Sequence, residues 1–135
     1  MGILLLSFAP AVQEGITITV THLRNDKGHV LVSLFKNEEG FPAKTEKAFR
    51  KEKVNIINKK AVITFSSLPA GNYAIAILHD ENDDMKMNTN FLGIPKEGYG
   101  FSNNVMGTFG PPSFNKASFK HQGNSVTYVT IRTRY

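Results

Sequence analysis

The chain of 135 residues contains no cysteine. A disulfide framework, a thiolate metal site and a cysteine nucleophile are therefore excluded, and stability must come from packing and strand pairing. The length suits one domain, and a composition with 41% apolar residues is typical of a folded protein with a buried core.

The chain also lacks an apolar run long enough to span a bilayer. Its most apolar stretch, Met1–Glu14, has only about nine to twelve such residues. This stretch resembles the apolar part of a signal peptide, and Ala9-Pro10-Ala11 suits a cleavage zone, although no basic residues precede it. We expect residues 1–14 to be a signal-peptide remnant or N-terminal extension and residues 15–135 to form the domain, in a secreted, periplasmic or cell-envelope protein. The alternative is a native first strand.

Acidic residues are absent after Glu97, and the formal net charge is +5. The densest basic segment lies between residues 44 and 60, where Glu46 and Glu52 interrupt seven lysines and arginines. No stacking platform or nucleic-acid-binding motif accompanies these charges. We therefore expect no nucleic-acid partner and interpret the charges as solvated strand edges and loops that discourage edge pairing.

Strong helical periodicity is missing, whereas two-residue alternation recurs along the chain. Strands are expected at residues 16–21, 30–35, 54–57, 61–65, 73–78 and 125–135. The first two strands and the next two are expected to form hairpins, and residues 45–51 a short helix capped by Thr45.

This pattern predicts an all-β fold, an antiparallel two-sheet Greek-key sandwich of the immunoglobulin-like or prealbumin-like kind. It would have six to eight strands and one short helix at most, with a closed barrel as the alternative. The expected core residues are Ile18, Val32, Leu34, Ile63, Phe65, Ile75, Ile77 and Tyr128.

The segment from residue 79 to residue 115 reads as one long loop, which is where function is expected. Its first part spaces oxygen ligands as a calcium loop does, with Asp80, Asn82, Asp84, the carbonyl of Lys86 and Asn88. Met85 stands where such a loop needs glycine, and Phe91 where it needs glutamate. A weak Ca²⁺ site and an acidic solvated turn both remain open.

The second part of this loop interleaves rings and amides with glycines. Tyr99, Phe101, Asn103, Asn104 and Phe109 are candidate ligand-binding residues, with rings that stack and amides that give direction. The alternative is that the rings bury one another and close one end of the sandwich.

Motifs for catalysis are missing as well. Neither a Gly-x-Ser-x-Gly elbow nor a His-Glu-x-x-His helix occurs, so no catalytic residue is predicted and we expect a protein that is not an enzyme. His79, which continues the phase of the strand at 73–78 and precedes Asp80, is the best single candidate for a base or ligand, but a lone histidine is more often structural.

Longer motifs resemble a bacterial family, the one known as domain of unknown function 2141. They are His79-Asp80-Glu81-Asn82, the run from Asn90 to Asn104 and Phe109-Gly110-Pro111-Pro112-Ser113-Phe114. Leu68-Pro69-Ala70-Gly71-Asn72-Tyr73 is also similar to transthyretin-like and carboxypeptidase-regulatory-like sandwiches. Typical members have a glycine-containing turn where this chain has Asp83-Asp84-Met85. They commonly have an aspartate where this chain has Asn88.

The resemblance implies an exported protein without an established activity. We therefore expect a noncatalytic binding or accessory module that uses residues 79–115 to bind an envelope or extracellular ligand. The alternatives are a structural assembly domain and a transthyretin-like hydrolase. The hydrolase would need a C-terminal Tyr-Arg-Gly-Ser, whereas this chain ends Arg132-Thr133-Arg134-Tyr135.

Overall fold

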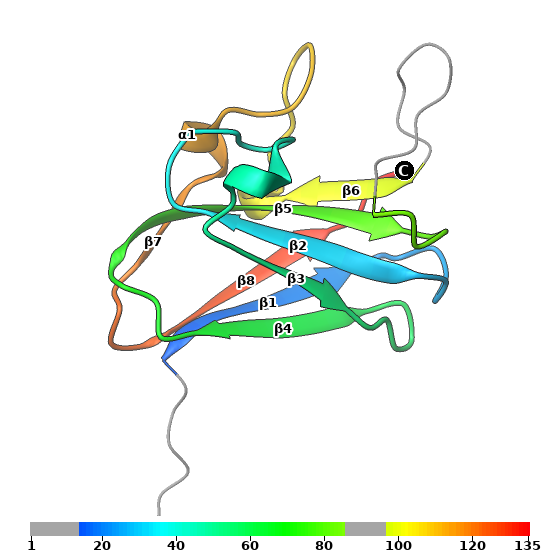
Figure 1. Ribbon diagram of the computed structural model, residues 1–135, viewed down its shortest axis with the longest axis horizontal. Helices are drawn as coiled ribbons and strands as arrows, with labels where there is room; N and C mark the ends of the chain where they lie inside the picture. The colour runs from blue at the N-terminus through cyan, green and yellow to red at the C-terminus, as the bar shows by residue number, and fades with distance from the viewer. Residues whose placement is uncertain (1–13, 86–96) are drawn as a thin grey trace, which may run out of the picture.

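The computed structural model describes residues 14–85 and 97–135, which form two packed sheets (Figure 1). The strands are β1 (Gly15–Thr21), β2 (His29–Phe35), β3 (Arg50–Val54), β4 (Ala61–Ser66), β5 (Gly71–Asp80), β6 (Gly98–Phe101), β7 (Phe119–His121) and β8 (Val126–Arg132). Two 3-10 helices, η1 (Thr45–Lys47) and η2 (Ser102–Asn104), and one short α-helix, α1 (Phe114–Ala117), complete the elements. The predicted all-β sandwich with one short helix is confirmed.

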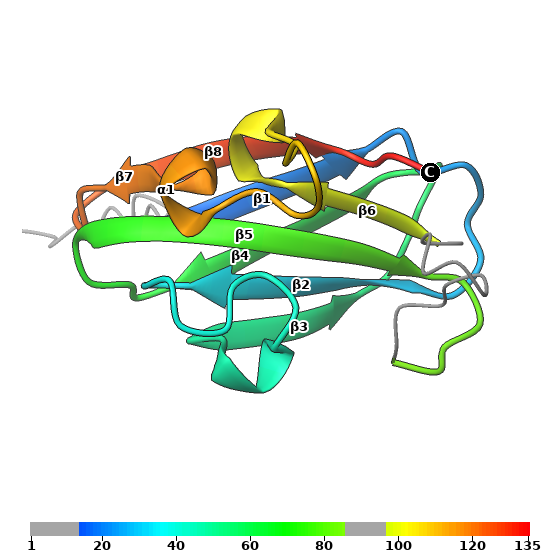
Figure 2. The same ribbon diagram turned by 90° about the horizontal axis from the view of Figure 1, so that it is seen from above.

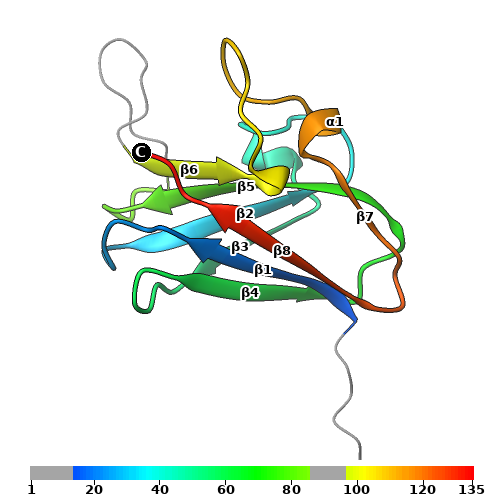
Figure 3. The same ribbon diagram turned by 180° about the vertical axis from the view of Figure 1, so that it is seen from behind.

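One sheet has the order β4-β1-β8, and the other has the order β3-β2-β5-β6, with β7 pairing along the start of β5 (Figure 3). Strands β1 and β8 are parallel, whereas the other pairs are antiparallel. The expected antiparallel arrangement is therefore correct except at this one pair.

The first expected hairpin is wrong, because the chain changes sheets between β1 and β2. Of the second, only the tight turn forms, with an antiparallel bridge between Ile57 and Lys60, because β3 and β4 belong to different sheets. Crossing between the sheets lets the apolar face of each strand turn toward the same core. The first crossover depends on Gly28, which has φ +64° and where a Cβ atom would lie 1.9 Å from the carbonyl oxygen of Asp80. The turn residues were recognised correctly, but they serve a crossover between sheets.

The expected helix at 45–51 shortens to η1, which begins after Lys44 rather than at a Thr45 cap. Strand pairing ends it early, because the backbone N–H of Phe49 donates to the carbonyl of Leu34 at 2.8 Å and Arg50 already belongs to β3. The second half of the predicted helix is therefore an edge strand.

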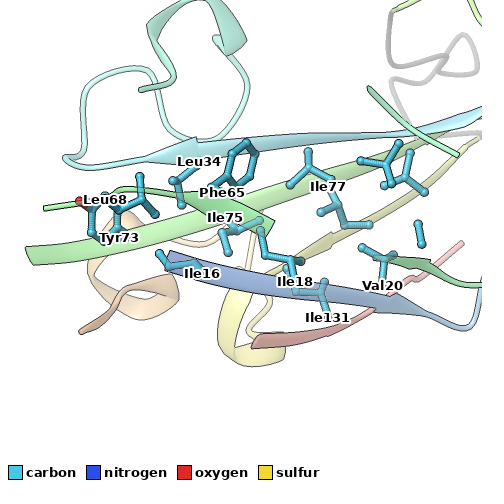
Figure 4. Close-up of a cluster of buried hydrophobic side chains, with 14 of the residues drawn as sticks. Ile16, Ile18, Val20, Leu34, Phe65, Leu68, Tyr73, Ile75, Ile77 and Ile131 are labelled. Carbon is cyan, nitrogen blue, oxygen red and sulfur yellow. The ribbon is translucent and has the colours of Figure 1, made fainter. Parts of the chain in front are cut away.

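The core lies between the two sheets (Figure 4). Of the residues expected there, Ile18, Val32, Leu34, Phe65, Ile75 and Ile77 are buried, and Ile63 is half-buried against them. Tyr128 is wrong, with 78% of its surface exposed. The parallel register sets Tyr128 beside Thr17 on the outer face, so Ile131 is the buried residue of β8 instead.

Within residues 14–85 and 97–135, no helix is long and apolar enough to cross a membrane. The predicted signal-peptide segment lies almost entirely outside the described residues, so the export prediction stands as made.

Candidate functional site

The outer face of the five-stranded sheet, turned away from the core, carries the candidate site. Leu31 of β2 faces Leu78 of β5, and Leu78 faces Tyr99 of β6. The neighbouring row repeats this arrangement with Ser33, Ala76 and Phe101. Paired residues share one face of a sheet, so these six side chains form a floor of small, aliphatic and aromatic groups.

Two loops rise beside this floor and turn it into a groove with a volume of about 790 Å³. One wall is the segment before β3, through Pro42, Ala43 and Thr45. The other is the loop after η2, through Met106, Gly107, Gly110 and Pro111. Both loops lie on the side of the five-stranded sheet away from the three-stranded sheet (Figures 1 and 2). Met85 contributes at the end of the groove nearest the β5–β6 connection.

The first wall is fixed by ring packing. Phe41 contacts Phe35 of β2, Phe101 of β6 and Phe114 of α1 edge-on, with ring centroids 5.3, 6.2 and 5.9 Å apart. Edge-to-face contacts of this kind add to simple area burial. The wall is thus attached to the strands that form the floor, and the groove is preformed.

The structure separates the five predicted ligand-binding residues. Tyr99 and Phe101 line the groove, with ring centroids 6.0 Å apart, whereas Phe109 is fully exposed. Asn103 donates to the carbonyls of Lys116 and Ser118, so its amide supports the end of α1. The rings at 101 and 114 do meet, through Phe41, as the packing alternative expected.

Asn104 also bonds to backbone. Its side-chain oxygen accepts from the N–H of Arg132 at 2.9 Å, and its amide nitrogen lies 3.5 Å from the carbonyl of Thr130. This attaches η2 to β8. Sequence reasoning missed the contributions of β2 and of residues 42–45 to the groove, because both precede the segment in which function was expected.

An acidic cluster occupies one corner of the same sheet face. Carboxylate oxygens of Asp80, Asp84 and Glu97 all lie within 4.8 Å of one another, and the side chains of Asp80 and Glu97 belong to buried residues. Asn82 lies beside the cluster, since its side-chain oxygen accepts from the N–H of Asp84 at 3.3 Å and Asp80 Oδ1 accepts from the same N–H at 3.2 Å. The predicted ligands Lys86 and Asn88 lie outside the described residues.

Burial raises the pKa of Asp80, because a charged carboxylate loses solvation there. Backbone N–H groups of Met85 and Asp84 hydrogen-bond to this carboxylate and oppose the shift, while Asp84 and the charge of Glu97 reinforce it. A hard cation would relieve the same repulsion, and carboxylate oxygens are the ligands that calcium prefers. The cluster can therefore hold either a proton or a cation.

Glu97 is the residue that sequence reasoning missed in this cluster. β5 and β6 pair with His79 opposite Gly98, and continuing this register by one residue sets Glu97 opposite Asp80. The signal was present only in the pairing of two strands separated by a long connection. Reading residues 79–115 as one loop concealed it, and β6 shows that this reading was wrong.

His79 is fully buried and both of its ring nitrogens have partners. Nε2 lies 2.8 Å from the carbonyl oxygen of Lys27, which can only accept, so Nε2 carries the proton. Nδ1 then accepts from the hydroxyl of Tyr135 at 2.6 Å, and that hydroxyl accepts from the N–H of Arg24. This arrangement joins the β1–β2 crossover to the C-terminal residue and leaves neither nitrogen open to a substrate.

Comparison with known proteins adds one match. The family model described as "Uncharacterized protein conserved in bacteria" (DUF2141) matches residues 18–129. No curated protein matches the chain, and no solved structure matches it. Because the matched segment runs from within β1 into β8, it includes both sheets, the groove and the acidic cluster. The chain therefore belongs to the DUF2141 family of bacterial proteins.

Proposed function

We propose that this protein is an exported, noncatalytic binding module whose ligand occupies the groove on the outer face of the five-stranded sheet. The observation that carries the proposal is the groove itself, with an apolar floor of strand residues and two loop walls. Its volume of about 790 Å³ lies within the range of ligand sites, which are commonly concave, largely apolar and preformed.

The position of the groove supports binding better than catalysis. Its floor residues Leu31, Leu78, Tyr99 and Phe101 include no histidine or carboxylate, and the buried His79 of β5 points to the core side. The transthyretin-like hydrolase is disfavoured for the same reason, since Tyr135 at the chain end bonds to His79 rather than lining the groove.

A structural assembly role predicts self-association through an exposed apolar face. Light scattering of the purified protein across a range of concentrations separates the two functions. A monomer that binds small apolar molecules supports the binding module. A dimer that fails to bind them supports assembly.

A neutral, apolar fluorescent dye such as Nile red tests the binding proposal. We expect saturable fluorescence enhancement with the native protein, because the dye would leave water for an apolar site. Ala76→Phe should abolish it by filling the floor of the groove. Thr19→Phe adds the same ring to the half-buried outer side of β1 and should leave binding unchanged. Melting curves verify that both variants fold.

Two results would contradict this proposal. One is the absence of saturable enhancement with the native protein. The other is unchanged binding by a folded Ala76→Phe variant.

A second role is favoured by one specific observation, the acidic cluster. We propose that Asp80, Asp84 and Glu97 bind Ca²⁺ weakly and that the ion stabilises the corner where β5 ends and β6 begins. Two buried carboxylates beside a third repel one another, and a divalent cation removes this repulsion. The glutamate that ends a linear calcium loop is replaced by Phe91 in the sequence, but Glu97, the residue before β6, supplies a carboxylate.

Export is the remaining part of the proposal, and it rests on the apolar residues at the start of the chain. We expect protein isolated from the cell envelope to begin between Ala9 and Glu14. Mass spectrometry of the mature N-terminus checks this. Envelope protein that retains Met1 to Ala11 would contradict it.

A further inference from the structure

We propose that the ligand of the groove is a single-chain amphiphile with an anionic head group, held with its head toward β3 and its chain across β2, β5 and β6. The inference rests on the proposed binding function and identifies the chemical class of the ligand. It is carried by the way in which charge and apolar surface are arranged on one sheet face.

The strand registers extend both rows of the groove floor to the basic edge strand. Lys53 of β3 faces Leu31, and Lys51 faces Ser33. The first row therefore reads Lys53, Leu31, Leu78 and Tyr99, and the second reads Lys51, Ser33, Ala76 and Phe101. Each row begins with an ammonium group, crosses small or aliphatic residues and ends at an aromatic ring.

These dimensions suit one extended chain. Four neighbouring strands span about 14 Å from β3 to β6, and residues two apart on a strand lie about 7 Å apart. The floor is thus about twice as long as it is wide. Ser33 and Ala76 are small, so the middle of the second row leaves room above the sheet. An alkyl chain lying along the rows would contact side chains along its whole length.

The basic end has excess positive charge. Lys51 and Lys53 end the two rows, whereas Glu52 between them pairs with Val32 and so belongs to the opposite face of the sheet. Lys53 Nζ lies 3.9 Å from Asp83 Oδ1, and the same oxygen lies 2.6 Å from Nδ1 of His29. Among the residues that the structure describes, Lys51 has no ion pair, and it is exposed. A head group with negative charge would complement this end.

The opposite corner disfavours the reverse orientation. Asp80 follows Leu78 by two residues on β5, so the acidic cluster adjoins the first row at the end of the strand. Along the sheet, the backbone positions of Asp80 and Lys51 are roughly 16 Å apart, as judged from strand and residue spacing. An anion near the acidic cluster would be repelled, whereas one near Lys51 would be attracted. The charges therefore select both the sign and the position of the head group.

Competition with the neutral dye tests the head group directly. Dodecanoate, dodecan-1-ol and dodecyltrimethylammonium share one chain length and differ in charge, and all are used below the concentrations at which they form micelles. We expect dodecanoate to displace the dye at about threefold lower concentration than the alcohol, because the exposed ammonium group of Lys51 contributes modestly and that of Lys53 is partly compensated by Asp83. The cationic amphiphile should displace it least. Decanoate should be weaker than dodecanoate by about fourfold for each methylene removed.

Paired variants locate the effect. Lys51→Gln/Lys53→Gln should remove the preference for dodecanoate over dodecanol. Lys59→Gln/Lys60→Gln changes the net charge by the same amount in the turn before β4, away from the groove, and should retain the preference.

Equal displacement by the acid and the alcohol would overturn the inference while leaving a groove that binds apolar molecules. Bound dye that no amphiphile displaces would also overturn it. A native protein that does not bind the dye at all would instead contradict the proposed function.

Discussion

The outer faces of the two sheets differ sharply, although both sheets contribute to one core. The three-stranded sheet presents Thr17 and Thr64, whose hydroxyls lie 2.8 Å apart, together with Val62 and Tyr128, which are 57% and 78% exposed. The five-stranded sheet presents apolar residues beneath two loops. One face is open and largely polar, while the other is apolar and recessed.

This difference is the one that the proposed binding function would require. When one face of a sheet packs on the core, the other face needs only residues that tolerate exposure to water, as the threonines of β1 illustrate. The five-stranded sheet departs from that pattern with Leu31, Leu78, Tyr99 and Phe101 and adds loop walls attached through Phe41. Folding alone does not require such a face, whereas a ligand site does.

The largest expected effect is the difference in the free energy of unfolding between a truncation on an inner face and one on the open outer face. Ile75, on the inner side of β5, is fully buried, so Ile75→Ala should lower the free energy of unfolding by about 2 to 5 kcal/mol. Tyr128→Thr on the open face should change it by less than about 0.5 kcal/mol. Denaturant unfolding measures both. A loss below about 0.5 kcal/mol for Ile75→Ala would show that the assigned inner face of β5 is wrong.

Calcium should stabilise the folded protein through the acidic cluster at the end of β5. At about 5 mM Ca²⁺ and a dissociation constant of about 0.1 to 1 mM, binding stabilises the folded state by roughly 1 to 2.3 kcal/mol. We expect a higher melting temperature in about 5 mM Ca²⁺ than in chelator, since sites of this kind bind in the millimolar range. Glu97→Gln should abolish the difference.

Asp83→Asn provides the matched control, because Asp83 lies in the same turn but pairs with His29 and Lys53 outside the cluster. It should keep the response to calcium. Coincident melting curves for the native protein would leave the cluster as an acidic turn, and an unaltered response of Glu97→Gln would exclude the three-carboxylate site.

Truncations on the two outer faces should also differ in how much they lower the free energy of unfolding, although this difference is smaller than the effects above. Leu78 is half-buried in the groove, so Leu78→Ala should cost about 1 kcal/mol. Val62→Ala, on the open face, should cost less than about 0.5 kcal/mol. Thermal unfolding of the two variants compares them. Equal losses would remove the distinction between the faces.

The smallest expected effect is a pH dependence at the acidic corner. Burial raises the pKa of Asp80, so in chelator the folded state binds more protons than the unfolded state between the ordinary and the raised value. Stability relative to Asp80→Asn should therefore rise as pH falls from neutral into this window. The Arg24–Glu81 ion pair, which lowers the pKa of Glu81 against the effect of its burial, is present in both proteins and cancels. A relative stability that decreases as the pH is lowered would contradict the account.

The strands were predictable wherever one face is buried and the other is not. Ile16, Ile18 and Val20 alternate with threonines, and β1 follows that pattern. The strand predicted at 54–57 is β3, which in fact covers Arg50–Val54. Its start was missed because Arg-Lys-Glu-Lys has no apolar alternation, which an edge strand needs less than a central strand does. β6 was missed because Gly98 and Gly100 occupy its inner positions. A Cβ atom at Gly100 would lie 2.8 Å from the carbonyl oxygen of Arg132, so close packing there excludes the usual strand residues.

The candidate site was predictable only in part, because its residues meet through strand pairing over long sequence distances. Alternation of large residues with alanines in β5 already indicated a close approach on one side, and Ala76 now lies in the groove floor. The pairing of β2 with β5 and of β5 with β6 supplies Leu31, Tyr99 and Glu97, and no local pattern encodes those registers. The sheet-to-sheet crossovers were hidden for the same reason.

The most direct test of the central claim maps a bound neutral ligand onto the two outer faces. Isotope-labelled protein titrated with dodecan-1-ol should show concentration-dependent NMR shift changes at the backbone amides of Leu31, Ala76 and Tyr99. Those of Thr17 and Thr64 on the open face should stay in place. Changes confined to the open face, or no saturable change on either face, would contradict a ligand site in the groove.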